Sequence, residues 1–65
     1  MVIQMNEFLI SEIRLLLVDD DPLVRRSLRM LFDLHDIPVV GEATNGEEAI
    51  ECINRLKPTM VLMDV

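Results

Sequence analysis

Three short apolar runs alternate along the chain with two longer segments in which apolar residues recur every three or four positions. The apolar runs lie at residues 13–18, 37–43 and 60–65. Near-continuous apolar runs of this length predict strands that are buried on both faces, as in a parallel sheet. Pro38, at the start of the second run, favours an edge strand, because proline cannot donate a hydrogen bond to a central ladder.

The first periodic segment predicts an amphipathic helix that begins at Pro22. Asp21 can accept hydrogen bonds from first-turn amides, and proline suits the first helical position, where its missing N–H would have no partner. The expected buried side of this helix contains Val24, Leu28, Leu31 and Phe32. Its expected outer side contains Arg25, Arg26 and Arg29. We expect these arginines to be solvated, although they also suit an acidic partner or a phosphate.

The second periodic segment predicts a helix between Asn45 and Pro58. Asn45 and Glu48 have the spacing of a capping box, with asparagine in place of the usual serine or threonine. The expected buried side contains Ala49, Ile53 and Leu56. Cys52 lies near this side, where a small packed thiol is more typical than a nucleophile.

The order of predicted elements is strand, helix, strand, helix, strand, with short connections. This order predicts an α/β fold with a parallel sheet and right-handed crossovers. The first strand is expected between the other two, which gives the strand order 2-1-3. In such sheets, ligands bind at the carboxyl ends of the strands where the winding direction reverses. The acidic residues 19–21 are therefore expected beside Asp64.

Length and charge limit the possible functions. A chain of 65 residues forms at most one small domain, which we assign to residues 13–65. Residues 1–12 show no clear period and are expected to be a mobile N-terminal extension. The net charge of −6 disfavours contact with nucleic acid, because phosphate contacts need clustered basic residues. No apolar run approaches the roughly 18 residues of a membrane span, and no signal peptide is recognisable, so a cytoplasmic location is expected.

The clustered carboxylates suggest a site for a cation. Several carboxylates in one place repel each other unless one is protonated or a cation neutralises them. Mg²⁺ takes oxygen ligands and works beside phosphate groups. Asp64, alone at a strand end, is the candidate nucleophile toward phosphorus, and Asp19, Asp20 and Asp21 are the candidate ion-binding group. The alternative interpretation is that residues 19–21 form only a solvated turn and a helix cap.

Three segments of the chain resemble the receiver domain of bacterial two-component response regulators. They are LLVDDDPLVR at residues 16–25, VGEATNGEEA at 40–49 and PTMVLMDV at 58–65, and the resemblance covers residues 13–65. It is strongest toward LuxR/NarL-type regulators, in which a helix-turn-helix follows the receiver. It implies a flavodoxin-like (CheY-like) fold and a signalling role in a phosphorelay, without enzyme activity. Asp19 and Asp20 match the pair that positions Mg²⁺, and Asp64 matches the residue phosphorylated by a sensor histidine kinase. Asp21 then remains as the helix cap.

The resemblance also implies elements that these 65 residues do not contain. A receiver has five strand–helix units, and its fourth and fifth strands end in a hydroxyl residue and a lysine that contact the phosphoryl group. The sequence holds the first two units and the third strand, so we expect a truncated receiver with impaired phosphorylation. Its third strand would have an open edge through which two copies could associate.

Two other functions remain open from the sequence. The chain could act only by interaction, pairing with a complete receiver or a kinase, in which case replacing Asp64 would not matter. A more remote alternative is a phosphatase of the haloacid dehalogenase-like class, which uses a D-x-D-x-[TV] motif. Asp19 and Asp21 fit that motif, but Leu23 does not. The single histidine, His35, is expected in an exposed turn.

Overall fold

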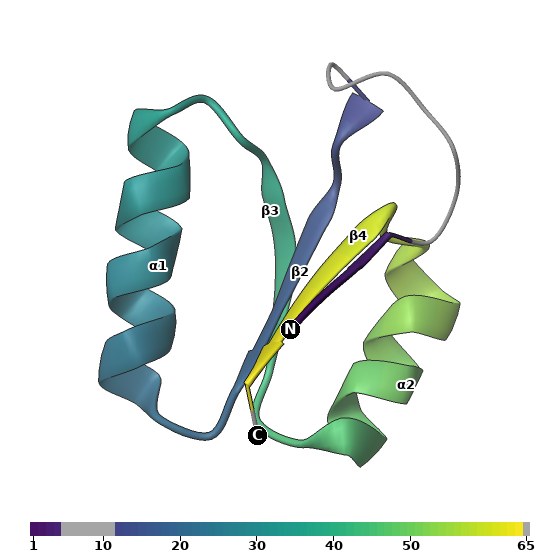
Figure 1. The fold of residues 1–65 in the computed structure, drawn as a ribbon. Helices are drawn as coiled ribbons and strands as arrows, with labels where there is room; N and C mark the ends of the chain where they lie inside the picture. Colours follow the sequence, from purple (N-terminus) through teal and green to yellow (C-terminus); the bar gives the residue numbers. More distant parts are fainter. Residues whose placement is uncertain (5–11, 65) are drawn as a thin grey trace.

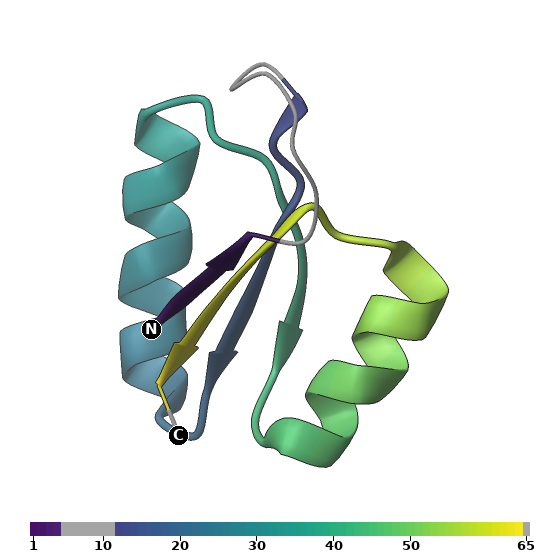
Figure 2. The same ribbon diagram turned by 45° about the vertical axis from the view of Figure 1, so that its right-hand side comes forward.

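The computed structural model of this protein describes residues 1–4 and 12–64. In chain order, its elements are β1 (Val2–Gln4), β2 (Leu15–Asp19), α1 (Pro22–Leu34), β3 (Val39–Ala43), α2 (Gly46–Leu56) and β4 (Met60–Asp64). The strands form one twisted sheet, and α1 and α2 lie on its opposite faces (Figure 1, Figure 2). Pro22 is the first residue of α1 and Pro58 follows the end of α2, as their helix-starting and helix-stopping chemistry predicts.

β2 occupies an interior position in the sheet, whose strand order is β1-β4-β2-β3. It pairs in parallel with β3 on one side and with β4 on the other. The predicted α/β fold and the predicted order 2-1-3 of the three parallel strands are therefore confirmed. The carboxyl ends of β2, β3 and β4 consequently lie at one edge of the sheet.

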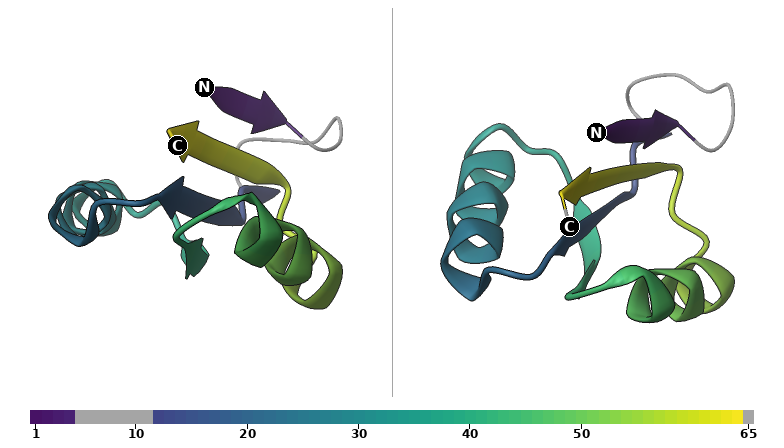
Figure 3. Two further views of the ribbon diagram at one scale, coloured as in Figure 1. Left: turned by 90° about the horizontal axis from the view of Figure 1, so that it is seen from below. Right: turned by 60° about the horizontal axis from the view of Figure 1, so that its bottom comes forward.

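The N-terminal segment differs from its prediction. Val2–Gln4, expected within a mobile extension, forms a strand that pairs antiparallel with β4 and places Ile3 opposite Val61. The view from below in Figure 3 shows β1 beside β4 at the margin of the sheet. The prediction of an open edge on the third strand is therefore wrong along this stretch, because β1 satisfies the groups that an unpaired edge would expose. Residues 5–11 of the predicted extension lie outside the described residues.

A cluster of buried apolar residues lies between the sheet and α2. It consists of Leu16, Val18, Ala43, Val61, Ala49 and Cys52. Successive strand residues point to opposite faces, so Leu15 and Leu17 of β2 point to the other face. Leu16 and Leu17 are both fully buried, which is the pattern of a strand covered on both faces.

Gly41 allows α2 to approach β3 closely. A Cβ atom at this position would lie only 2.6 Å from Leu56 Cδ1 and 3.4 Å from Leu16 Cδ1. The first of these distances is shorter than any ordinary carbon–carbon contact. The side chain of Leu56 therefore uses space that only a glycine leaves open, and this contact helps to seat the last turn of α2 on the sheet.

α1 is rotated relative to its predicted orientation. The structure describes all 13 residues of α1, and none of them is fully buried. Leu28 and Phe32 are half-buried as expected, but Val24 and Leu31 are 38% and 48% exposed. The side chain of Arg25, predicted on the solvated face, is only 16% exposed. On this side of α1, Arg25 and Arg29 both pair with Glu42 on β3. No helix among the described residues is long and apolar enough to cross a membrane.

Candidate functional site

The two aspartates that end the predicted first and third strands are direct neighbours in the sheet. In the parallel pairing of β2 with β4, Asp19 lies opposite Asp64. Adjacent strands are about 4.8 Å apart, and directly opposed residues point to the same face. The two carboxylates therefore share one face at the carboxyl edge of the sheet, on the side of α1.

The turn that follows β2 is held by hydrogen bonds from the backbone to aspartate side chains. Asp19 Oδ1 accepts from the N–H of Asp21 at 2.9 Å, and Asp21 Oδ1 accepts from the N–H of Leu23 at 2.9 Å. The first bond uses one of the two carboxylate oxygens of Asp19. The second shows that Asp21 caps α1, as predicted.

The carboxylates at this edge differ in their access to solvent. Asp19 is 5% exposed, whereas Asp20 and Asp64 are exposed. Their oxygen donors suit Mg²⁺, which keeps several waters and takes only one or two protein carboxylates. Within the described part of the chain, however, no three acidic, histidine or cysteine side chains converge into a ready-made metal cluster. An ion at this edge would therefore be held by the carboxylates together with water.

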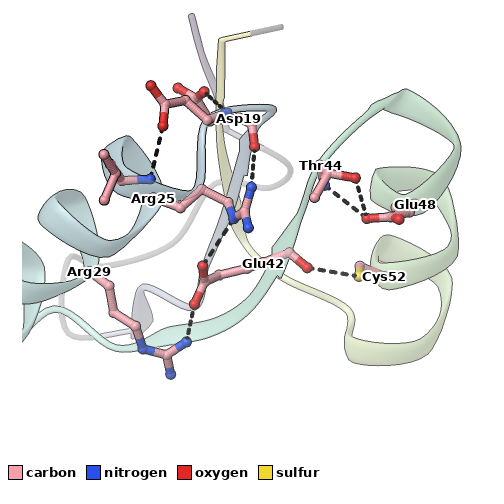
Figure 4. Close-up of polar contacts among 9 residues, drawn as sticks. Asp19, Arg25, Arg29, Glu42, Thr44, Glu48 and Cys52 are labelled. Carbon is pink, nitrogen blue, oxygen red and sulfur yellow. Dashed lines mark hydrogen bonds and ion pairs between the residues drawn. The ribbon is translucent and has the colours of Figure 1, made fainter.

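A charged network next to this turn was not anticipated from the sequence. Arg25 Nη1 donates to the backbone oxygen of Asp19 at 2.7 Å, and Arg25 Nε donates to Glu42 Oε1 at 3.2 Å. Arg29 Nη1 donates to Glu42 Oε2 at 2.7 Å. Figure 4 shows Arg25 reaching between the end of β2 and Glu42, with Arg29 on the far side of the same carboxylate. The helical spacing of the arginines was visible in the sequence, but the position of Glu42 opposite them was not.

A second polar cluster fixes the start of α2. Asn45 Oδ1 accepts from the N–H of Glu48 at 2.9 Å, which confirms Asn45 as the cap. Glu48 returns its carboxylate to Thr44 instead of Asn45, and accepts from the Thr44 N–H at 2.9 Å and hydroxyl at 2.8 Å. These bonds, with a smaller contribution from the charge of Arg25, lower the pKa of Glu48 below its ordinary value.

The part of the chain that contains the paired aspartates matches a known protein family. Residues 15–65 match the response regulator receiver domain, which is more than half of the chain. The chain belongs to the response regulator receiver domain family. The match includes both strands that carry the paired aspartates and the turn between β2 and α1. This match disfavours the phosphatase alternative, because the segment of residues 19–23 that suggested it lies within the receiver domain.

Proteins similar to this receiver include response regulators and proteins named as methylesterases. Response regulator GacA of Pseudomonas viridiflava is 52% identical over 54 residues, which cover 82% of this chain and 25% of the relative. A protein-glutamate methylesterase/protein-glutamine glutaminase of Methanococcoides burtonii is 52% identical over 54 residues, covering 82% of this chain and 15% of the relative. Transcriptional regulatory protein BtsR of Salmonella typhimurium is 43% identical over 54 residues, which cover 82% of this chain and 23% of the relative. The receiver chain thus spans a quarter or less of these relatives.

The remaining candidate residues of the receiver lie away from the aspartates. His35 is exposed at the end of α1, as expected. Cys52 is 7% exposed, and its thiol faces the backbone oxygen of Glu42 at 3.8 Å. Among the described residues, one shallow surface hollow lies beside Asp36 and Pro38, and another lies beside Glu51 and Cys52. Neither Asp19 nor Asp64 lines these two hollows.

Proposed function

We propose that this receiver acts in a phosphorelay, in which Asp64 accepts a phosphoryl group from a sensor histidine kinase. In this proposal, Asp19, Asp20 and Asp64 hold Mg²⁺ at the carboxyl edge of the sheet. The observation that carries it is the pairing of Asp19 with Asp64 in a chain that belongs to the receiver family. A signalling role follows from the family, and the residue roles and the kinase partner are the proposed part.

The chemistry assigns a different task to each aspartate. A carboxylate oxygen of Asp64 attacks the phosphorus of phosphohistidine, the P–N bond breaks, and its electron pair returns to the imidazole nitrogen. The product is an acyl phosphate on Asp64. The exposed position of Asp64 leaves the carboxylate accessible to a donor on another protein. Mg²⁺, when bound, supplies positive charge that offsets repulsion between the carboxylates and the phosphoryl oxygens.

Asp19 and Asp20 would serve the ion and not the covalent step. Asp19 is nearly buried and already fixed by the Asp21 N–H, so its carboxylate has a defined direction before any ion arrives. Asp20 is exposed and can turn toward a hydrated ion. A rigid ligand beside an adaptable one suits Mg²⁺, which keeps part of its water shell.

The proposed setting is the cytoplasm, and the proposed partners are proteins. The net charge of −6 disfavours contact of this chain with nucleic acid, and we assign it no membrane contact and no enzyme activity of its own. A second candidate function is interaction without phosphoryl transfer. The observation that favours it is the exposed apolar surface of α1, where Leu23 and Leu34 are 72% and 77% exposed.

Phosphoryl transfer can be tested with phosphoramidate, whose P–N bond resembles that of phosphohistidine. The full chain is incubated with Mg²⁺ and phosphoramidate, and its intact mass is measured. We expect a mass gain of one phosphoryl group that is lost on treatment with hydroxylamine, which cleaves acyl phosphates. The gain should disappear in Asp64→Asn.

The matched control is Asp36→Asn, which removes an exposed aspartate far from the site. Asp36 has a φ of 58°, and asparagine tolerates this left-handed conformation well. This variant should be phosphorylated like the unmodified chain. A mass gain that persists in Asp64→Asn, or no gain in the unmodified chain, would refute phosphoryl transfer to Asp64 and favour the interaction-only function.

A further inference from the structure

Arg25 joins three elements at the acidic edge of the sheet. It lies in α1, and its guanidinium donates to the backbone oxygen of Asp19 in β2 at 2.7 Å and to Glu42 in β3 at 3.2 Å. Its side chain is 16% exposed, so these bonds are partly shielded from water. Arginine suits this position because its planar fork can donate to two acceptors in different directions at once.

The acceptor in β2 is the last residue of that strand. Beyond Asp19 the chain leaves the ladder and enters the acidic turn of residues 19–21. Inside the turn, Asp19 Oδ1 accepts from the N–H of Asp21, and outside it the Asp19 carbonyl accepts from Arg25. Asp19 is therefore held from both sides, and Figure 4 shows both bonds at this one residue.

Glu42 fixes the direction of the arginine. Its Oε1 accepts from Arg25 and its Oε2 accepts from Arg29 at 2.7 Å, so the carboxylate lies between two guanidinium groups. Arg29 directs its other donor to the backbone oxygen of Val39 at 3.4 Å, at the opposite end of β3. The two arginines thus share a carboxylate, but only Arg25 reaches the acidic turn.

We propose that Arg25 is a positioning residue, which holds the turn after β2 in the conformation that lets Asp19 and Asp20 receive Mg²⁺. The binding of Mg²⁺ in this proposal rests on the proposed function, whereas the role of Arg25 in fixing the turn does not. The bond to the Asp19 carbonyl sets the backbone direction, and that direction sets where the Asp19 and Asp20 side chains point. Partners that orient metal ligands in this way are typically worth a factor of 10–100 in metal affinity.

Two other roles for Arg25 make different predictions. If Arg25 only fastens α1 to the sheet, then Arg29, which binds the same carboxylate, should be equivalent to it. If Arg25 acts only through its positive charge near the aspartates, then lysine should replace it. Lysine keeps the charge but lacks the fork, so it cannot hold Glu42 and the Asp19 carbonyl in the same geometry.

The experiment compares Arg25→Met, Arg25→Lys and Arg29→Met in the full, isotope-labelled chain by NMR. In the metal-free state, Arg25→Met and Arg25→Lys should both shift the carbonyl signal of Asp19 and the amide signals of Asp20 and Asp21. Arg29→Met should leave these signals in place. In a titration with Mg²⁺ alone, both Arg25 variants should bind roughly tenfold more weakly, and Arg29→Met should bind like the unmodified chain.

The outcomes separate the possibilities. Equal shifts in Arg25→Met and Arg29→Met would overturn the positioning role, and so would full recovery in Arg25→Lys. If Arg25→Met does not fold, Glu42→Gln retains the arginine but weakens its hold, and should shift the same three signals by less. If the unmodified chain does not bind Mg²⁺, the proposed ion site is wrong, and the metal-free spectra alone decide whether Arg25 positions the turn.

Discussion

The two faces of the sheet are covered by helices that are attached in different ways. α2 places Ala49 and Cys52 in an apolar core together with residues of β2, β3 and β4. α1, described in full, has no buried residue and is anchored to Glu42 by Arg25 and Arg29. The difference separates the helix that packs into the apolar core from the helix whose arginines lie beside the acidic turn of residues 19–21.

The physical reason lies in the two kinds of contact. Apolar burial is not directional and contributes about 25 cal/mol for each square ångström removed from water, so the buried strand residues and the core under α2 supply most of the stability. Ion pairs near the surface contribute only about 0–1 kcal/mol each. They are directional, however, and on the α1 face their direction connects α1 to the turn that carries Asp19.

The largest expected effect on this comparison is loss of core packing on the α2 side. Leu16→Ala removes a fully buried side chain and should lower the free energy of unfolding by about 2–5 kcal/mol. Leu31→Ala, on the exposed side of α1, should change it by less than about 0.5 kcal/mol. Urea denaturation followed by circular dichroism measures both. Similar losses in the two variants would contradict the assignment of stability to the buried apolar core.

A smaller effect is expected from the charged contacts on the α1 side. Glu42→Gln removes the negative charge shared by the two arginines and should lower the free energy of unfolding by about 0.5–1 kcal/mol. The double variant Glu42→Gln/Arg29→Met should lose less free energy of unfolding than the sum of the two single variants. The reason is that each single change already removes the ion pair between Glu42 and Arg29. The same urea measurement checks this, and strict additivity would mean that the pair does not contribute to folding.

The smallest expected effect is a pH dependence at the start of α2. The pKa of Glu48 is lowered in the folded chain, first by the Thr44 N–H and then by the Thr44 hydroxyl. Its contribution to stability is therefore complete above the ordinary value of 4.5 and is lost as the pH falls through the lower folded pKa. Unfolding curves from pH 7 to pH 3 should show a weaker acid dependence in Glu48→Gln than in the unmodified chain. Glu47→Gln, in the same first turn of α2, is the control, and an equal change in both variants would point to the general charge of the helix start.

The sequence was most informative where structure depends on local pattern. The apolar runs predicted the three parallel strands and their order, and Pro22, Asn45 and Pro58 predicted where the helices begin and end. The family resemblance rested on the residues around Asp19 and Asp64, and the family is confirmed by the match over residues 15–65. The roles of Asp19, Asp20 and Asp64 in ion binding and phosphoryl transfer remain predictions.

The sequence was less informative where a contact depends on how the folded backbone places two residues in space. The helical period of α1 is compatible with more than one rotation, and the sequence did not show that Arg25 and Arg29 pair with Glu42 on β3. Likewise, Glu48 has the spacing to return to Asn45, but the loop geometry brings Thr44 to its carboxylate instead. Val2–Gln4 is too short to show a strand period, and its strand became visible only through its pairing with the edge of β4.

The sequence by itself determined the three parallel strands, the two helices, their order and the two aspartates at the ends of β2 and β4, because hydrophobic period and helix capping depend on residues close together in the chain. The tertiary structure decided that β1 covers β4, that α1 turns its arginines toward Glu42, and that Arg25 reaches the Asp19 carbonyl. The first two of these contacts join residues that come together only when the sheet has formed, and the third depends on the packing of α1 beside β2. The energies of these contacts depend on distance and direction in space, and neither quantity can be obtained from the separation of two residues along the chain.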